Sequence, residues 1–396
     1  MNANERRLHL TGTCRSGASE QLESTRELSK LVYYITAHGY GHGVRSADII
    51  RAFAHSCPDV PIEIVTDLPP AFLQNRLPGV AVQFRRGAFD VGMVQVDSVC
   101  INIGATLERA QNLRSNWEPL VDQEARLLEE RHAGLVVADI PAIPLQAAAR
   151  AGIPGLAVAN FGWDWIYQEY AARDARWLPV VRAFASGYAT ARLLLRLPLH
   201  EEMSSFPSVE DIPLVSSPGV DRRCEIAGLT GCSPAHHWVL LSFTTLAWNT
   251  EALKSVEAIP GYEFFTVLPL EWKRRNVHAL DREQVPFMDI VASVDTVISK
   301  PGYGIVSDCI INRKPLVYVD RSDFREYAVL EAGIKKCLRN VHVSQEKLYS
   351  GDLLTSLERV REAPDPPFSM PAGGERVASA RILGHGPWGL ASSDQY

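Results

Sequence analysis

Two segments far apart in the chain have the same form: a short apolar run, a glycine-rich loop and the start of a helical pattern. The first is ITAHGYGHGVRS at 35–46, and the second is VISKPGYGIVSD at 297–308. In a parallel α/β sheet, ligands bind beyond the carboxyl ends of the strands, where such loops lie. The two segments therefore predict two α/β units, each with a candidate binding loop after a strand.

Apolar runs alternate with helical patterns through both halves of the chain. The first half has expected strands at 31–36, 62–67, 80–87, 134–139 and 155–160, and expected helices at 45–57, 105–131 and 144–152. The second half has expected strands at 238–243, 263–268, 296–299 and 316–319, and expected helices at 249–258, 286–293 and 304–312. This alternation is typical of parallel, doubly wound sheets.

A stretch rich in Pro, Ser and Gly at 200–235 interrupts the pattern, and we expect a linker in its second half. The predicted organisation is a tail, two α/β domains and a second tail, with limits at 1–29, 30–215, 216–383 and 384–396. A last helix is expected at 374–383, inside the second domain.

Composition narrows the class of protein. The 396 residues carry a net charge of −6 without a long basic run, which disfavours nucleic acid as a partner. The longest apolar patch, near 193–199, is far shorter than the roughly 20 residues that span a bilayer, and the first thirty residues lack a signal-peptide core. Seven scattered cysteines without a C-x-x-C pair indicate unpaired thiols. We expect a cytoplasmic protein without a transmembrane segment; the oligomeric state is not predicted.

The second loop has the features of an anion site. Backbone N–H groups at a helix start, left accessible by small residues, bind phosphate well. Lys300 adds a cation, and Asp308 lies one helical turn after Gly304, where it can accept hydrogen bonds from ribose hydroxyls. The candidate residues of this loop for binding the phosphates and ribose of a nucleotide are Lys300, Gly302, Tyr303, Gly304 and Asp308. The simpler alternative is that the glycines only permit a tight strand-to-helix turn.

The loop matches neither G-x-x-x-x-G-K-[ST] nor G-x-G-x-x-G, which disfavours a P-loop kinase and an ordinary dinucleotide enzyme. A D-x-D triplet that would hold Mg²⁺ against a diphosphate is also absent. We therefore expect no metal and no cofactor, with the diphosphate held by a helix start and basic side chains.

The first loop places His38 and His42 among glycines, which supply no packing. Histidine has an ordinary pKa of about 6.5 and can accept a proton at neutral pH. We predict that His42 is a general base or contacts the substrate, with His38 the weaker candidate. Metal ligation and helix capping are the alternatives, although the intervening glycines argue against a helix that would align both rings.

This combination resembles the two-domain glycosyltransferases of GT-B architecture, notably the MurG and UDP-glycosyltransferase group. YGHGVR matches the G-G-H loop of their first domain, with His42 at the histidine, and 299–327 matches the glycine loop, helix-borne acid and G-x-P strand of their second domain. The resemblance implies two Rossmann-like domains facing across a cleft. It also implies donor contacts from the polar loop residues Arg321, Asp323 and Glu326, although the D-Q or Q-x-x-N ending of the family is absent.

A closer resemblance is to the glycosyltransferase-like N-terminal region of plant L-arabinokinases and its bacterial relatives. Four segments carry it, at 33–45, 89–98, 136–170 and 297–327. NFGWDWIYQEY is the most distinctive, because five large aromatic residues around a carboxylate are unusual outside a binding cleft. Nothing matches the sugar kinase half of those proteins, so kinase activity is not implied.

Polar and aromatic residues of these segments are candidates for acceptor binding. They are Asp90, Gln95, Asp97, Asn160, Trp163 and Asp164. Asp139, which ends a strand, is a further catalytic candidate because it could orient His42. Alternatively, such acids cap helices or turns, and the tryptophans fill an interdomain surface.

The sequence thus predicts a metal-independent, inverting glycosyltransferase that moves a hexosyl or pentosyl group from a UDP-sugar or related nucleotide sugar to a small hydroxylated acceptor. The alternatives are a nucleotide-sugar epimerase or hydrolase on the same fold, and a non-catalytic protein that binds a nucleotide sugar.

Overall fold

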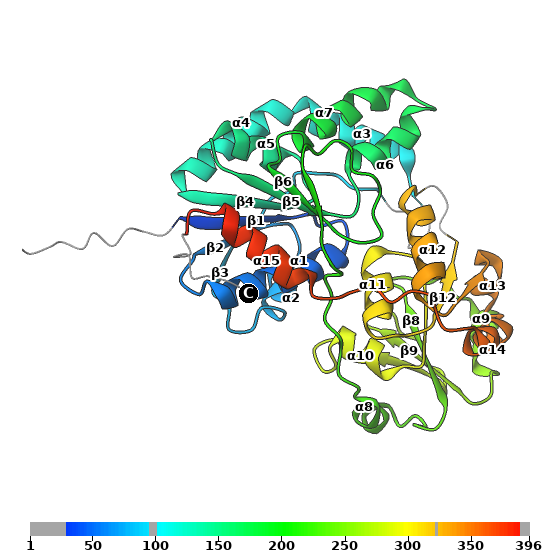
Figure 1. The fold of residues 1–396 in the computed structure, drawn as a ribbon. Helices are drawn as coiled ribbons and strands as arrows, with labels where there is room; N and C mark the ends of the chain where they lie inside the picture. The colour runs from blue at the N-terminus through cyan, green and yellow to red at the C-terminus, as the bar shows by residue number, and fades with distance from the viewer. Residues whose placement is uncertain (1–28, 95–100, 321–323, 389–396) are drawn as a thin grey trace, which may run out of the picture.

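The computed structural model describes residues 29–94, 101–320 and 324–388. The chain forms two α/β halves, each built on a parallel sheet (Figure 1). The first sheet has the order β3-β2-β1-β4-β5-β6-β7 and the second the order β10-β9-β8-β11-β12-β13. The predicted α/β class with two doubly wound halves is confirmed.

The strands of the first sheet are β1 (Lys30–Ile35), β2 (Ile62–Val65), β3 (Val82–Arg85), β4 (Ala133–Asp139), β5 (Gly155–Ala159), β6 (Leu193–Arg196) and β7 (Val209–Asp211). The helices of this part of the chain are α1 (Tyr40–Ser56), α2 (Pro70–Gln74), α3 (Ile103–Ser115), α4 (Trp117–Glu130), α5 (Ile143–Arg150), α6 (Trp163–Ala171), the short 3₁₀ helix η1 (Ala175–Trp177) and α7 (Leu178–Tyr188).

The strands of the second sheet are β8 (His237–Ser242), β9 (Tyr262–Val267), β10 (Val277–Leu280), β11 (Thr296–Ser299), β12 (Leu316–Val319) and β13 (Asn340–Val343). The later helices are α8 (Arg223–Thr230), α9 (Thr250–Glu257), α10 (Phe287–Ser293), α11 (Tyr303–Ile311), α12 (Glu326–Cys337), α13 (Gln345–Ser350), α14 (Leu354–Glu362) and α15 (Gly374–His385).

Strand β1 shows why the central strands are almost continuously apolar. Leu31, Tyr33 and Ile35 pack into the core that contains α1, whereas Val32 and Tyr34 pack into the core formed with α3 to α7. A strand covered by helices on both faces has no side left for polar residues. The cluster on the α1 side also includes residues of the second half, so apolar packing joins the two halves.

Each sheet reverses its strand order between two central strands. In the first sheet, Ile35 at the end of β1 pairs with Asp139 at the end of β4. In the second sheet, Ser242 of β8 pairs with Ser299 of β11. Crevices at such reversal points are the usual ligand sites of open α/β sheets, and both glycine loops begin at one.

Several element boundaries differ from the sequence predictions. The expected helix 105–131 is two helices, α3 and α4, separated at Asn116, and α8 lies in the expected linker. Strands β6, β7, β10 and β13 were not predicted. Helix α1 begins at Tyr40, five residues before the predicted start, because Gly39 is extended and Gly41 and Gly43 fit inside the first turns. His42 is therefore a helical residue, not a loop residue.

The last helix returns to the first half of the chain. Helix α15 runs beside α1 (Figure 1), and the Trp388 ring lies 5.2 Å from the Phe53 ring of α1. The predicted limits place 374–383 in the second domain, whereas α15 packs against the first. Helix α15 covers an apolar face of α1, and this burial of apolar side chains explains why the chain returns to the first half.

Candidate functional site

The two glycine loops meet where the halves contact each other. A Cβ atom on Gly304 would lie 3.3 Å from the Cα atom of Gly41, so a side chain at this position would crowd the facing backbone. Neither α1 nor α11 has a side-chain cap or an acidic residue in its first turn. Because each helix start carries a partial positive charge of about half a unit, two positive ends face each other without a compensating group from these helices.

The donor-loop residues fall into two groups. Space is open above Gly302, where an added Cβ would have no neighbour within 4 Å, and its backbone is extended. Tyr303, in contrast, is buried beneath Arg45, whose guanidinium carbon lies 5.0 Å from the ring centroid. The backbone N–H groups near Gly302 and the side chain of the flanking Lys300 are therefore better placed than the Tyr303 side chain to contact a ligand.

Asp308 faces the interior. Its side chain is buried, and Oδ1 accepts a 3.4 Å hydrogen bond from the Ser216 hydroxyl. Burial raises the pKa of Asp308 to about 7, although the nearby Arg76 guanidinium opposes the shift. A ribose could reach this carboxyl only by replacing Ser216.

His42 belongs to a buried charged network. Its Nδ1 atom lies 2.8 Å from Oδ1 of Asp139, which also accepts two hydrogen bonds from Arg45 and one from Ser46. Burial alone would raise the pKa of Asp139, but Arg45 and His42 lower it to about 2. An ionised carboxylate thus lies beside the imidazole, and Nη2 of Arg45 lies 3.0 Å from the same Nδ1 atom. In the tautomer in which Nδ1 donates to Asp139, Nε2 is the nitrogen that can accept a proton.

The same network reaches the second half of the chain. Arg45 donates a 2.9 Å hydrogen bond to Oδ1 of Asn160, and Nδ2 of Asn160 donates a 2.8 Å bond to Oε1 of Glu326. Glu326 is the first residue of α12, and all three side chains are buried. The residues around His42 are therefore connected to the second half of the chain by direct side-chain hydrogen bonds.

His38 has a separate carboxylate partner. Its Nε2 atom lies 3.0 Å from Oδ1 of Asp90. Thr36 donates to the same carboxylate, and so does the indole N–H of Trp163. Burial alone would lower the pKa of His38, but the Asp90 carboxylate outweighs it and the pKa is raised. His38 thus carries a proton more readily than an ordinary histidine, which suits hydrogen-bond donation better than proton abstraction.

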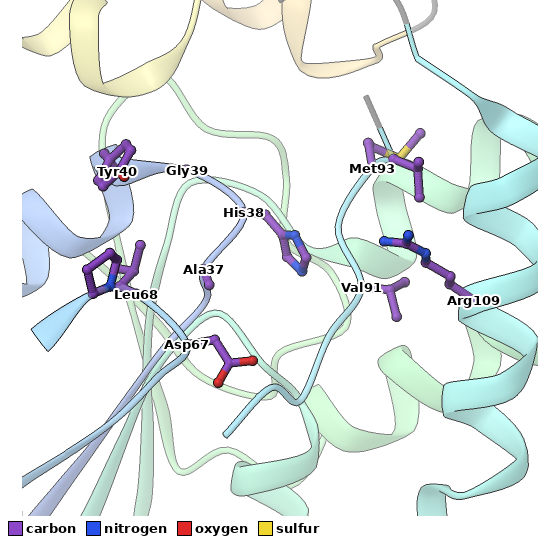
Figure 2. A pocket seen from close by; sticks show the side chains of 11 residues that line it. Ala37, His38, Gly39, Tyr40, Asp67, Leu68, Val91, Met93 and Arg109 are labelled. Carbon is purple, nitrogen blue, oxygen red and sulfur yellow. The ribbon is translucent and has the colours of Figure 1, made fainter. Parts of the chain in front are cut away.

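A cavity of about 490 Å³ opens beside His38 in the first half of the chain (Figure 2). It is lined by Ala37, His38, Gly39, Tyr40, Asp67, Leu68, Pro69, Val91, Met93, Val94 and Arg109. Its volume falls within the range of about 300–1,000 Å³ that is usual for small-molecule sites. It lies next to the loop that leads into His42.

The aromatic segment has a mainly structural arrangement. Trp163 is buried, stacks on Tyr167 and hydrogen-bonds Asp90, so it supports the His38 partner instead of presenting a face to solvent. Asp164 accepts a hydrogen bond from Ser205. Trp165 is partly buried below the guanidinium of Arg325, 4.4 Å from its ring centroid, at the contact between the halves.

Four of the candidates, Gln95, Asp97, Arg321 and Asp323, lie outside the described residues. The structure also adds Arg45, Ser46 and Arg109, which sequence reasoning did not single out. Arg45 could have been found, because it lies three residues after His42 and so shares a face of the same helix. Arg109 could not, since nothing in the α3 sequence distinguishes it from the other surface arginines.

In the described part of the chain, no helix is long and apolar enough to cross a bilayer. No group of three or more His, Cys, Asp and Glu side chains among those residues is arranged to hold a metal ion.

Comparison with solved structures defines the class of fold. The chain superimposes on a UDP-glucosyltransferase from Polygonum tinctorium with a TM-score of 0.60 at 11% identity, covering 91% of this chain and 99% of the other. It superimposes on the kitacinnamycin glycotransferase with a TM-score of 0.58 at 14% identity, covering 91% and 100%. For the calicheamicin glycosyltransferase CalG4 the TM-score is 0.55 at 14% identity, covering 90% and 94%. The chain has the GT-B glycosyltransferase fold.

A curated relative is more similar in sequence. The L-arabinokinase of Arabidopsis thaliana is 28% identical over 342 residues, which are 83% of this chain and 32% of that protein. The chain is thus a distant homologue that spans about a third of the relative's length. No protein-family profile matches the sequence.

Proposed function

We propose that this protein is a glycosyltransferase that moves a sugar from a nucleoside diphosphate donor to a small hydroxylated acceptor, with inversion at the anomeric carbon. The observation that carries the proposal is the meeting of two uncapped helix starts at Gly41 and Gly304. Two like partial charges repel, and an anion bound beside both helix starts would be attracted by each of them. The diphosphate of a nucleotide sugar supplies such an anion.

The donor is assigned to the second half. The open space at Gly302 lets the backbone N–H groups of α11 approach the β-phosphate, and Lys300 lies beside them. Asp308 accepts hydrogen bonds from the ribose in place of Ser216, and Glu326 lies near the sugar. The similarity to a UDP-glucosyltransferase supports uridine as the base.

The acceptor is assigned to the cavity beside His38, and His42 is the general base. His42 follows Gly41, which contacts the donor half, and comes two residues after Tyr40 of the cavity lining, so we assign it to the junction of the two regions. Nε2 removes the acceptor hydroxyl proton as the oxygen attacks the anomeric carbon and the C–O bond to the diphosphate breaks. Asp139 stabilises the imidazolium that forms, and UDP leaves with the bonding electron pair.

Incubation of the protein with UDP- and GDP-sugars, alone and with pools of small hydroxylated acceptors, tests this function. The expected result is release of free UDP that depends on an acceptor. Release of UDP without any acceptor would favour a hydrolase, interconversion of the donor sugar would favour an epimerase, and failure to bind any nucleotide would contradict all three.

Gly302→Val tests the donor loop. Its backbone conformation suits any residue and an added Cβ has no neighbour, so the variant should fold normally. Its side chain would occupy the space given to the diphosphate and remove one or two charge-assisted hydrogen bonds, lowering UDP affinity by roughly ten- to hundredfold. Calorimetric titration with UDP measures this.

Gly228→Val is the matched control, because Gly228 lies in α8 and also has no neighbour within 4 Å of an added Cβ. It should bind UDP as the parent protein does. Equal UDP affinity in both variants would place the diphosphate elsewhere.

A further inference from the structure

The cavity beside His38 includes a cationic side chain, that of Arg109, in its lining. Arg109 projects from α3 and lines the cavity with His38, and the two flank the segment of Val91 and Met93 (Figure 2). Within the described residues, Arg109 has no hydrogen bond or ion pair. Arg45 and Arg85, in contrast, are ion-paired. An unpaired guanidinium in a cavity wall is a binding group for an anion.

The rest of the lining restricts the size and charge of that anion. Leu68, Val91, Met93 and Val94 provide apolar walls, which favour a ligand with an apolar body. Asp67 also lines the cavity, with only a 3.6 Å contact to the exposed Arg86 side chain, and Asp90 lies behind His38. Two carboxylates near one guanidinium would repel a dianionic phosphate more strongly than a singly charged carboxylate.

We infer that the acceptor is a small hydroxy acid, whose carboxylate binds Arg109 and whose hydroxyl points toward His42. This inference rests on the proposed glycosyl transfer and names the substrate class of the same site. His38 donates a hydrogen bond to the ligand from the nitrogen that does not face Asp90. The apolar part of the acid packs between Leu68 and the Val91–Met93 segment.

The test uses two compounds that differ only in charge, 4-hydroxybenzoate and its neutral amide 4-hydroxybenzamide. Calorimetry or ligand-observed NMR measures the binding of each to the full chain. We expect the parent protein to bind the acid at least about tenfold more tightly than the amide, because only the acid forms a charge-assisted bond to the guanidinium. 4-Hydroxyphenyl phosphate should bind more weakly than the acid.

Three variants assign the preference to one side chain. Arg109→Gln should bind acid and amide equally, and Arg109→Lys should keep part of the preference because it keeps the charge. Arg114→Gln is the matched control on the same helix, outside the cavity lining, and should behave as the parent protein. A thermal melt of each variant confirms that it is folded.

The inference is overturned if the parent protein binds acid and amide equally, if it binds neither at millimolar concentration, or if the preference survives in Arg109→Gln. A UDP titration of the same samples separates this result from the donor proposal. Normal UDP binding without an acid preference refutes only the acceptor class, whereas an acid preference without UDP binding refutes the glycosyltransferase proposal.

Discussion

Replacing His42 with Ala should reduce turnover by roughly 10²- to 10⁴-fold, the usual contribution of a positioned proton acceptor. UDP affinity should change little, because the variant keeps the backbone of the α1 start and leaves the donor contacts of the second half intact. The substrate pair with the fastest UDP release in the parent protein provides the assay.

His55→Ala is the control for this experiment, because His55 is an exposed residue in the last turn of the same helix. It should leave turnover unchanged. His38→Ala should mainly raise the KM for the acceptor, since His38 lines the cavity and its raised pKa favours hydrogen-bond donation to a ligand there. A near-normal rate for His42→Ala would refute its role, and a larger loss of kcat at His38 would transfer the role to that residue.

The sequence was sufficient to predict the two halves and the strands at their centres. Strands β1 and β11 are short apolar runs that lead within a few residues to a glycine loop, and β4 is an apolar run that ends in a carboxylate, so local pattern alone determines them. Edge strands were harder. Strand β6 lies in the apolar patch near 193–199, which the sequence pattern did not identify as a strand. Strands β7 and β13 are too short and too polar to form a recognisable pattern.

The partners of the predicted residues could not be predicted, because they depend on packing between distant segments. Asn160 and Glu326 are 166 positions apart and are joined only when the halves contact each other. The pairing of His38 with Asp90 and of His42 with Asp139 likewise follows from which loops lie beside β1 in the folded sheet. The sequence indicated Asp139 as an acid that could orient His42, but not that Asp90 would pair with His38.

Asp308 should make the protein less stable as the pH rises. Burial raises its pKa from 3.8 to about 7, so the folded protein binds a proton across this range that the unfolded chain has released. The free energy of unfolding therefore falls between about pH 4 and pH 7, by up to an amount on the order of 4 kcal/mol for a shift of about three pKa units, and is constant with respect to this group above that range.

Asp308→Asn removes this loss, because the amide is neutral at every pH and can still accept the hydrogen bond from Ser216. Urea unfolding at pH 5 and pH 8 should show the variant gaining stability relative to the parent protein at the higher pH, while the exposed Asp59→Asn shows no such gain. A parent protein whose stability does not fall relative to Asp308→Asn would mean that the carboxyl is ionised at little cost.

The same substitution, Asp308→Asn, should weaken UDP binding, because an amide oxygen accepts hydrogen bonds from ribose hydroxyls less strongly than a carboxylate does. A carboxylate retained at the expense of stability is expected where ligand binding uses its charge. A stabilised variant with unchanged UDP affinity would therefore separate Asp308 from the ribose and leave the buried acid without a role in binding.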